Sequence, residues 1–277
     1  MDTSCDVSII IVNYNTRELT KKCLVSVFEH TSGVCFEVIV SDNGSTDGSI
    51  EMIKVDFPQV ILIENGENIG FGAANNRGLR IAKGKYIFYL NSDTILLNNA
   101  VKIFFDYWEN AEEKDLLGAL GGVLLDEELQ ETHSSGDFPN YKRALRCLLS
   151  CFLDSIGLKQ FFRKFKQKSN KCERRGMVDY ITGADLFIEK ENASFDEFFF
   201  LYFEETDMQL CLERKKLKRM IIDGPKIIHL NGGSEKNKTV KYSFGKTTRM
   251  YYWDSCLRYM KKNHYQIFAF FFLKVLY

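Results

Sequence analysis

The chain has 277 residues, of which 45% are hydrophobic and only three are prolines; this is enough for one large core and offers no proline-rich linker between independent domains. The formal net charge is zero, but residues 142–175 hold eleven bases against two acids, and residues 236–277 hold nine against one. This distribution predicts two segments that face an anionic partner, and the lack of a recognised nucleic-acid motif argues against nucleic acid in that role.

The N-terminal residues include two acids and no basic stretch before the first apolar run. We therefore expect no signal peptide and a cytoplasmic chain. The eight cysteines form no CxxC pair and no zinc-like spacing, so they are interpreted as core and surface thiols.

Strands and helices alternate in the first third of the chain. Apolar, β-branched runs predict buried strands, and apolar residues at helical spacing predict the helices between them. In chain order the predictions are a strand at 7–12, a helix at 17–29, a strand at 36–40, a helix from about 49, a strand at 60–63, a helix at 72–82 and a strand at 86–90. This rhythm is typical of βαβ units and predicts an α/β fold, with a mostly parallel central sheet and helices on both faces.

The second half of the chain is less regular. The predictions are a strand at 117–125, a loop or hairpin at 126–140, a basic amphipathic stretch at 141–168, strand-like residues at 178–190, a helix at 206–217, two short strands within 218–229 split by Gly224-Pro225, and a final helix at 246–262. The last helix predicts a C-terminal helical extension of the sheet domain.

Three polar loops follow predicted strands. Asn13-Tyr14-Asn15 comes after the first strand, Asp42-Asn43 after the second, and Asn91-Ser92-Asp93 after the fourth. Ligands of such sheets bind beyond the carboxyl ends of the strands. We therefore expect these loops to converge on one site.

Two residues at strand ends suit a divalent cation. Asp93 offers the hard oxygen that Mg²⁺ and Mn²⁺ prefer, although an Asp in this place can also cap a helix. His229 precedes Gly232-Gly233, where the backbone could approach a diphosphate, although a lone histidine is often a structural residue. Both interpretations of each residue stay open at this point.

Two further segments could serve a site. Glu204, Glu205 and Asp207 follow an aromatic run and open a predicted helix, where acids can simply match the helix dipole. Alternatively, one of them acts as a general base whose pKa is raised by an aromatic wall. Residues 67–76 form a glycine-containing loop leading into a helix that could hold a phosphate, although the loop lacks GxGxxG spacing and a P-loop lysine.

Seven segments of the chain resemble a known family when taken together and in order: VSIIIVNYN, VIVSDNGSTDGS, ENIGFGAANNRGL, GKYIFYLNSDT, VDYITGAD, FDEFFFLYFEETDMQLC and IIHLNGGS. The set is similar to the family 2 glycosyltransferases of GT-A fold, and most to their bacterial rhamnosyltransferase-like branch, over about residues 7–235. The resemblance implies a GT-A (Rossmann-like) catalytic domain at 1–235, with a basic insert at about 141–175, and a basic and aromatic helical segment at 236–277.

The resemblance also implies an inverting transfer from a UDP- or dTDP-sugar, with Mn²⁺ or Mg²⁺, to a hydroxyl of a glycan or lipid-linked glycan in surface polysaccharide synthesis. By this resemblance Asp93 and His229 hold the metal, and Glu205 is the base, with Glu204 beside it and Asp207 as its partner. The residues that would bind the nucleotide or the donor sugar are Val12, Tyr14, Asp42, Asn43, Asn75, Asn91, Ser92, Gly183 and Ala184.

The chain departs from the family pattern at two positions. Asn91 replaces the first aspartate of the DxD motif, which removes a carboxylate from the metal site and predicts weaker metal affinity. Glu205 stands where the family has an aspartate, so its carboxylate reaches out by one more methylene. Both changes are compatible with the rhamnosyltransferase-like branch.

Residues 267–277 are strongly apolar but number only eleven, fewer than the ~20 residues of a spanning helix. Together with the basic and aromatic residues before them, they predict a peripheral contact with the anionic inner face of the cell membrane. The alternative is a C-terminal helix packed on the core.

Two other functions are weighed against the transferase. A sugar-1-phosphate nucleotidyltransferase would need a glycine- and arginine-rich loop after the first strand, where this chain has VNYNTRE. A non-catalytic module that binds a glycan or a nucleotide is the other alternative.

Overall fold

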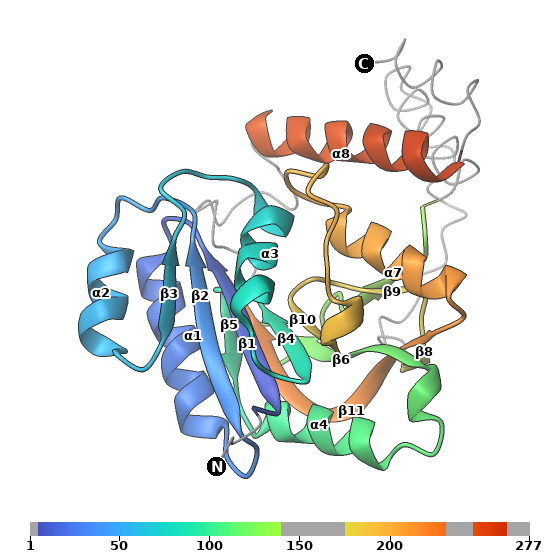
Figure 1. The fold of residues 1–277 in the computed structure, drawn as a ribbon, viewed down its shortest axis with the longest axis horizontal. Helices are drawn as coiled ribbons and strands as arrows, with labels where there is room; N and C mark the ends of the chain where they lie inside the picture. The colour runs from blue at the N-terminus through green and yellow to red at the C-terminus, as the bar shows by residue number, and fades with distance from the viewer. Residues whose placement is uncertain (1–4, 140–174, 231–245, 265–277) are drawn as a thin grey trace.

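The computed structural model describes residues 5–139, 175–230 and 246–264. Most of the predicted basic insert, Gly232-Gly233 and the apolar segment 267–277 lie outside the described residues. The described chain builds one large sheet with helices on both faces, and one further helix, α8 (Lys246–His264), lies above it (Figure 1).

The main sheet has the strand order β3-β2-β1-β4-β10-β6-β11-β5 among the described residues, and β8 pairs with β11 beside this path. Its strands are β1 (Val7–Asn13), β2 (Phe36–Asp42), β3 (Ile61–Glu64), β4 (Tyr86–Leu90), β5 (Thr94–Leu96), β6 (Leu117–Leu125), β8 (Gly176–Met177), β10 (Asp185–Glu189) and β11 (Lys218–His229); β7 (Ser135–Gly136) and β9 (Tyr180–Ile181) pair separately. Within the described ranges, the helices besides α8 are α1 (Arg17–His30), α2 (Ser49–Asp56), α3 (Phe71–Ile81), α4 (Ala100–Asn110) and α7 (Glu204–Arg214), with short 3₁₀ turns η1 (Lys114–Leu116) and η2 (Lys190–Asn192).

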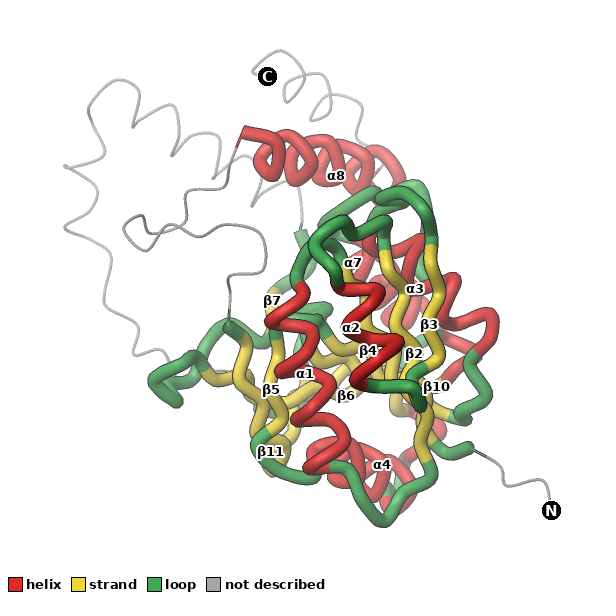
Figure 2. Tube along the Cα trace, turned by 90° about the vertical axis from the view of Figure 1, so that its left-hand side faces the viewer, coloured by secondary structure: helices red, strands yellow, loops and turns green. Residues whose placement is uncertain are grey.

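Alternate residues of the strands pack on opposite faces of the sheet, as the pleat requires. In β1, Ile9 and Ile11 join the core cluster under α1, α2 and α4, whereas Ile10 joins the cluster on the side of α3 and α7. Figure 2 shows α1 and α2 in front of the strands that they cover. Because strands such as β1 are buried on both faces, their sequences are apolar without alternation.

The N-terminal half of the sheet is parallel, as predicted. β1 pairs with β2 and β4, β2 pairs with β3, and all three pairings are parallel. Asn13 stands beside Asp42 at the last register position of β1 and β2. The prediction of an α/β fold with a largely parallel sheet, helices on both faces and a C-terminal helix is confirmed, and antiparallel pairs are added by β5, β8 and β10.

The prediction of two short strands within residues 218–229 was wrong. These residues form the single strand β11, which pairs with β6 on both sides of an irregularity between Ile222 and Lys226. The bulge accommodates Gly224, which has a φ of 116°, and Pro225, because a proline can enter a strand where the ladder is interrupted.

The turn after β4 leads into a strand and not into a helix. Thr94–Leu96 forms β5, which pairs antiparallel with the end of β11 and sets Thr94 opposite His229. The helix-cap interpretation of Asp93 is therefore excluded. Helix α4, which was not predicted from the sequence, begins only at Ala100.

Helix α8 packs as an additional layer outside the main core. Its Tyr259 and Met260 are buried against Phe199 and Phe203, which precede α7. The predicted final helix is confirmed, and it extends to His264. Among the residues that the structure describes, no helix combines the length and the apolar character needed to cross a bilayer.

Candidate active site

The loops after β1 and β2 are fastened together by Asp42. Its carboxylate is buried; Oδ2 accepts a 2.5 Å hydrogen bond from the Asn13 amide, and Oδ1 accepts hydrogen bonds from the backbone N–H groups of Gly44 and Ser45. Since an ionised carboxylate offers about four acceptor positions, Asp42 has little capacity left. Asp42 therefore shapes the loop that was predicted to hold the nucleotide base.

A chain of hydrogen bonds continues from Asp42 to the loop after β4. The side-chain oxygen of Asn13 accepts a 2.7 Å hydrogen bond from the Thr16 hydroxyl. The same hydroxyl lies 3.2 Å from the hydroxyl of Ser92, the residue before Asp93. The loops after β1, β2 and β4 thus form one network at a single rim of the sheet.

Asp93 and His229 meet at the end of this network. The Asn91 carbonyl accepts hydrogen bonds from the backbone N–H and the hydroxyl of Thr94, which closes a turn around Asp93. His229 is brought beside that turn by the β5–β11 pairing. Its Nε2 lies 3.3 Å from Asp93 Oδ1, and the two side chains are 17% and 14% exposed.

The Asp93–His229 pair fits a divalent cation that is completed by substrate. A carboxylate is the ligand type that Mg²⁺ and Mn²⁺ prefer, and imidazole is a common metal ligand. The described residues contain no group of three or more His, Cys, Asp or Glu side chains that could enclose an ion. Two protein ligands leave positions for the oxygens of a diphosphate, as in many nucleotide sites.

Glu204 and Glu205 open α7 directly after two residues with left-handed backbone. Tyr202 and Phe203 have φ angles of 70° and 69°, and such conformations cost on the order of 1–3 kcal/mol each unless the surroundings impose them. Burial raises the pKa of Glu204 well above its usual value, and the carboxylate of Glu205 raises that pKa further. Burial also raises the pKa of Glu205, whose side chain stays partly exposed.

Glu205 lies on the same rim as the Asp93–His229 pair. A methyl group built on Gly183 would lie 3.8 Å from Cβ and Cγ of Glu205. The next residue, Ala184, accepts a 3.0 Å hydrogen bond at its carbonyl from the backbone N–H of Asn91. Residues 183–184, which were predicted to bind the donor, therefore connect Glu205 to the turn that carries Asp93.

Several buried oxygen atoms around this rim have no hydrogen-bond partner within the described part of the chain: Asn91 Oδ1, Thr182 Oγ1, Asp185 Oδ1 and Glu204 Oε2. An unsatisfied buried polar group costs about 1–3 kcal/mol, and native proteins keep few of them. Each of these residues is within two positions of Asp93, Gly183, Ala184 or Glu205 in the chain, so the segments of the candidate site contain unsatisfied polar atoms.

Asn43 organises the loop between β3 and α3. Its buried side chain donates hydrogen bonds to Asn68 Oδ1 and to the Gly70 carbonyl, both at 3.2 Å, and accepts one of 2.8 Å from the Asn65 amide. Asn43, which was predicted to bind the nucleotide, therefore already uses its side chain to hold this loop.

We expect Gly70→Ala to destabilise the site by roughly 1–3 kcal/mol and to weaken nucleotide binding. Gly70 has a φ of 92°, and an added Cβ would lie 2.5 Å from the Phe200 carbonyl oxygen, so the segment before Glu204 would have to move. Urea unfolding and nucleotide titration measure the effects. Gly66→Ala is the control, because Gly66 has a φ of 79° with nothing within 4 Å of an added Cβ. Equal losses in both variants would contradict the steric argument.

The remaining predicted donor-binding residues differ in exposure. Tyr14 is 47% exposed at the rim, and Val12 is partly exposed. Asn75 is buried inside α3, where its amide donates a hydrogen bond to the Phe71 carbonyl one turn earlier. The exposure of Val12 and Tyr14 is compatible with the ligand contacts predicted for them. The buried position of Asn75 does not support the ligand contact predicted for that residue.

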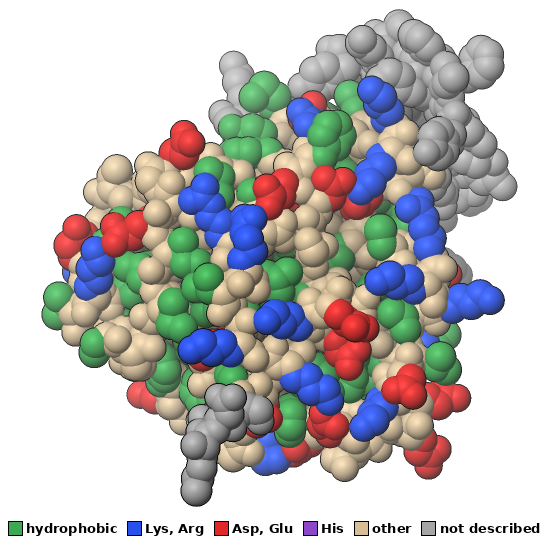
Figure 3. All heavy atoms as spheres, in the orientation of Figure 1, with side chains coloured by type: hydrophobic (Ala, Val, Ile, Leu, Met, Phe, Trp, Pro, Cys, Tyr) green, Lys and Arg blue, Asp and Glu red, His purple; other side chains and the backbone are tan. Residues whose placement is uncertain are grey.

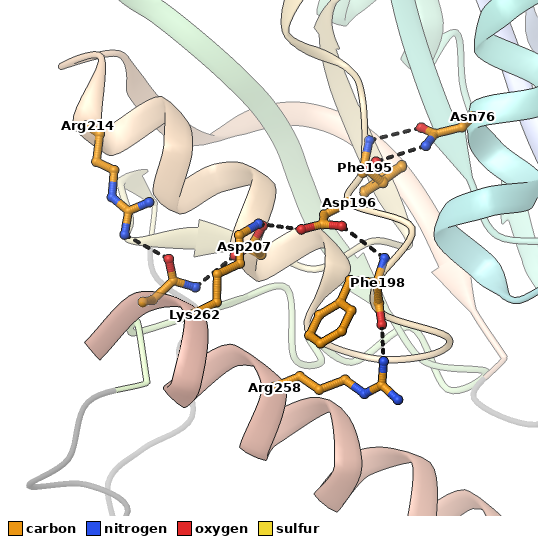
Figure 4. Close-up of polar contacts among 9 residues, drawn as sticks. Asn76, Phe195, Asp196, Phe198, Asp207, Arg214, Arg258 and Lys262 are labelled. Atoms are coloured by element: carbon orange, nitrogen blue, oxygen red, sulfur yellow. Dashed lines mark hydrogen bonds and ion pairs between the residues drawn. The ribbon is translucent and has the colours of Figure 1, made fainter. Parts of the chain in front are cut away.

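Asp207, predicted as the catalytic partner of Glu205, is engaged elsewhere. Residues two apart on a helix point to different sides, and the buried Asp207 carboxylate pairs with Lys262 of α8 at 2.7 Å (Figure 4). It also accepts a 2.8 Å hydrogen bond from the Asn263 amide. Of the acids that open α7, Glu205 therefore lies at the rim, whereas Asp207 belongs to the contact between α7 and α8.

The sequence interpretation missed Asp185. This residue opens β10 directly after Ala184; its Oδ2 accepts a 2.7 Å hydrogen bond from the Gly122 N–H, and burial raises its pKa well above the usual value. An acid at the head of the otherwise apolar stretch Leu186-Phe187-Ile188 was the available signal.

Asp185 should make stability fall as pH rises. Its folded-state pKa lies above the ordinary value of 3.8, so the folded state keeps the proton to a higher pH than the unfolded state does. Between about pH 4 and the raised pKa, the free energy of unfolding therefore falls as pH rises, by at most about 1.4 kcal/mol per pH unit. We expect Asp185→Asn to flatten the pH dependence of the free energy of unfolding. Denaturant titrations at several pH values measure it, with the exposed Glu127→Gln as control. Parallel curves for wild type and Asp185→Asn would refute the prediction.

Two glycosyltransferases are among the relatives of this sequence. The UDP-Glc:alpha-D-GlcNAc-diphosphoundecaprenol beta-1,3-glucosyltransferase WfaP of Escherichia coli is 33% identical over 168 residues, which are 55% of this chain and 62% of that protein. The poly(ribitol-phosphate) beta-glucosyltransferase of Bacillus spizizenii is 32% identical over 122 residues, 42% of this chain and 19% of that protein. The chain thus spans less than two thirds of the length of these relatives.

Solved structures share the fold at low sequence identity. The mannosyltransferase PcManGT of Pyrobaculum calidifontis, in complex with GDP-Man and Mn²⁺, superposes with a TM-score of 0.56 at 15% identity, covering 86% of this chain and 61% of that one. GalNAc-T7 with UDP, GalNAc and Mn²⁺ gives a TM-score of 0.61 at 14% identity, covering 94% and 48%. These matches confirm a GT-A-like fold.

The sequence profile of Glycosyl transferase family 2 matches residues 8–169. This match contains the loops of Asp42 and Asp93 and covers more than half of the chain, so the protein belongs to glycosyl transferase family 2.

Proposed function

We propose that the protein is an inverting, metal-dependent glycosyltransferase that moves a sugar from a UDP- or dTDP-sugar to a hydroxyl of a glycan or lipid-linked glycan. The observation that carries this proposal is the single rim that holds the Asp93–His229 pair and, across Gly183-Ala184, the partly exposed carboxylate of Glu205. One end of this arrangement suits a diphosphate, and the other suits an attacking hydroxyl.

Glu205 is the group suited to take the proton of the acceptor hydroxyl as that oxygen attacks the anomeric carbon. Its raised pKa brings its titration closer to neutrality, where a general base is most effective, and such assistance is typically worth about 10²- to 10⁴-fold. Glu204, the residue before it, is buried, and burial together with the neighbouring Glu205 carboxylate raises the pKa of Glu204 well above its usual value. Single displacement at the anomeric carbon inverts its configuration.

Asp93 and His229 would hold the divalent cation beside the diphosphate of the donor. When bound, Mn²⁺ or Mg²⁺ would neutralise the charge that builds on the leaving diphosphate. The Mn²⁺ complexes of the fold neighbours support the choice of metal. Because Asn91 contributes an amide where the family has a carboxylate, we expect a weak metal site that depends on the nucleotide.

The class of acceptor is inferred from the relatives. WfaP is named for transfer to a diphosphoundecaprenol-linked sugar, and the Bacillus relative is named for transfer to poly(ribitol-phosphate). Both names support a role in surface polysaccharide synthesis. The seven-segment resemblance supports the rhamnosyltransferase-like branch and residues 1–235 as the catalytic domain.

A panel of UDP-, dTDP- and GDP-sugars, assayed for donor hydrolysis and transfer with Mn²⁺ or Mg²⁺, tests the proposal. We expect one donor to be hydrolysed slowly with metal and not with EDTA. Formation of a nucleotide-sugar from a nucleoside triphosphate and a sugar-1-phosphate would instead identify a nucleotidyltransferase. Nucleotide binding without turnover of any donor would identify a non-catalytic module.

We also propose that the protein works as a peripheral protein on the cytoplasmic, anionic face of the cell membrane. The aromatic rings of α8 do not all support this contact, because Tyr259 is buried and Tyr251 packs 4.7 Å from Phe200. Met250 and Tyr252 are 50% and 38% exposed, and hydrophobic side chains gather beside α8 at the upper edge of the surface (Figure 3).

Flotation of the full chain with liposomes tests the membrane proposal. We expect it to rise with phosphatidylserine-containing vesicles at low salt and to stay at the bottom with phosphatidylcholine alone, because basic segments gain about 1 kcal/mol per Lys or Arg near an anionic surface. A chain that fails to float with either vesicle would refute the proposal.

A further inference from the structure

Lys262 of α8 joins two acidic residues from different segments, Asp196 in the loop before α7 and Asp207 in α7 itself. Its Nζ lies 2.6 Å from Asp196 Oδ2 and 2.7 Å from Asp207 Oδ2 (Figure 4). Asp207 is buried, whereas Asp196 and Lys262 are about one third exposed. Removing the cationic partner of a buried carboxylate strongly destabilises the fold, so this bridge holds α8 and α7 together.

The bridge ends on the first turn of α7, close to the general base. Asp207 lies two residues after Glu205, and its backbone N–H donates to the Phe203 carbonyl in the first hydrogen bond of the helix. The second oxygen of Asp207 is held by Asn263. A displacement of α8 would therefore act directly on the helical turn that carries Glu205.

The other end of the bridge holds the aromatic loop at 196–203. Asp196 Oδ1 accepts a hydrogen bond from the Phe198 N–H, and Arg258 of α8 donates to the Phe198 carbonyl and covers its ring at 4.5 Å. Ser255 of α8 donates a 2.8 Å hydrogen bond to the Leu201 carbonyl. Helix α8 thus contacts this loop along its length.

The loop needs such support because it ends in strained backbone. Tyr202 and Phe203, with left-handed φ angles, immediately precede Glu204, and backbone of this kind persists only when packing over-determines it. That packing comes from α8: Phe203 lies against Tyr252 and Tyr259, at centroid distances of 5.3 and 5.5 Å.

We propose that α8 is a clamp that positions Glu205, with Lys262 as its central residue, and that Asp207 serves the reaction through this clamp and not by touching the reacting atoms. The inference rests on the proposed function for its catalytic consequence. Its structural part, that Lys262 orders residues 196–205, stands on the contacts alone.

The catalytic test compares Lys262→Met, Asp207→Asn and their double variant with the exposed neighbour Lys261→Met as control. We expect each single variant of the clamp to lower kcat about 10- to 100-fold, as small misplacements of catalytic groups do, with the KM for the donor changed less than about twofold. The double variant should be no worse than Lys262→Met, because it leaves no unpaired buried carboxylate. Lys261→Met should behave as wild type.

Asp207→Asn also separates positioning from catalysis. If Asp207 touched the reacting atoms, its amide variant would be as inactive as Glu205→Gln, and the losses of Lys262→Met and Asp207→Asn would multiply in the double variant. That result would overturn the proposal. A lowered melting temperature with unchanged kcat and unchanged pH profile would overturn it as well.

Amide hydrogen exchange gives a readout that does not depend on activity. We expect Lys262→Met to speed exchange across residues 198–206 and to leave β1 and β2 unchanged. Unchanged exchange across 198–206 would overturn the clamp even in an active enzyme. Inactivity of the wild type with every donor would overturn the proposed function instead, and the exchange experiment would still decide whether the clamp exists.

Discussion

Glu205→Gln should lower sugar transfer by at least about 10²-fold while leaving nucleotide affinity within a few-fold of wild type. The substitution keeps the shape of the side chain and removes the ability to accept a proton, which is the contribution expected of a general base. The nucleotide contacts predicted for Val12 and Tyr14 lie on other loops of the rim and should remain. Transfer rates and titration with the free nucleotide measure the two effects.

The pH profile adds an independent check on Glu205. A base must be ionised to work, so kcat/KM should rise with pH through the pKa of this carboxylate, which burial raises above its ordinary value of 4.5. The acid limb of the wild-type profile should therefore lie above pH 4.5. Glu197→Gln, an exposed carboxylate of the same segment, is the control and should keep that limb. Full activity of Glu205→Gln would remove Glu205 from the role of base.

Asp93→Asn should make the enzyme strongly dependent on added metal and should lower kcat/KM by at least about 10²-fold at low metal concentration, since charge stabilisation by a cation is worth several kcal/mol. Asp93 is the one carboxylate in the turn after β4, because Asn91 already carries an amide. Measuring the rate against Mn²⁺ and Mg²⁺ concentration gives the apparent metal affinity, and nucleotide titration with and without metal separates ion binding from nucleotide binding.

His229→Asn and Glu51→Gln calibrate the Asp93 result. His229 lies 3.3 Å from Asp93 and should give a smaller shift in metal affinity of the same direction. Glu51 is an exposed carboxylate of α2 outside the predicted site, so its variant should leave metal affinity unchanged. An Asp93→Asn enzyme with the metal dependence of wild type would exclude Asp93 as a ligand.

Several parts of the site could be read from the sequence because they depend on local pattern. The apolar runs of β1, β2 and β4 and the helical spacing between them required a parallel βαβ arrangement, and polar residues at strand ends then had to share one rim. Asp42 and Asp93 were placed correctly at this rim by that argument alone. Glu205 needed the resemblance to a family as well, because acids that open a helix have an equally good structural explanation.

Other parts depended on contacts between residues far apart in the chain. Nothing local indicates that β10 inserts antiparallel between β4 and β6, or that β5 leaves β4 to pair with the end of β11 and thereby sets His229 beside Asp93. Likewise, Asp207 has the same sequence context as Glu205, but its partner Lys262 lies 55 residues later.

The sequence by itself thus determined the layered α/β architecture, the rim at which its polar loops meet and the family to which the resemblance points. Only the tertiary structure decided which acids lie partly exposed at the rim and which are buried in contacts between distant segments. The physical reason is that strand and helix periodicity is set by neighbouring residues, whereas the burial and the ion-pair partner of a carboxylate are set by whichever distant segment packs against it.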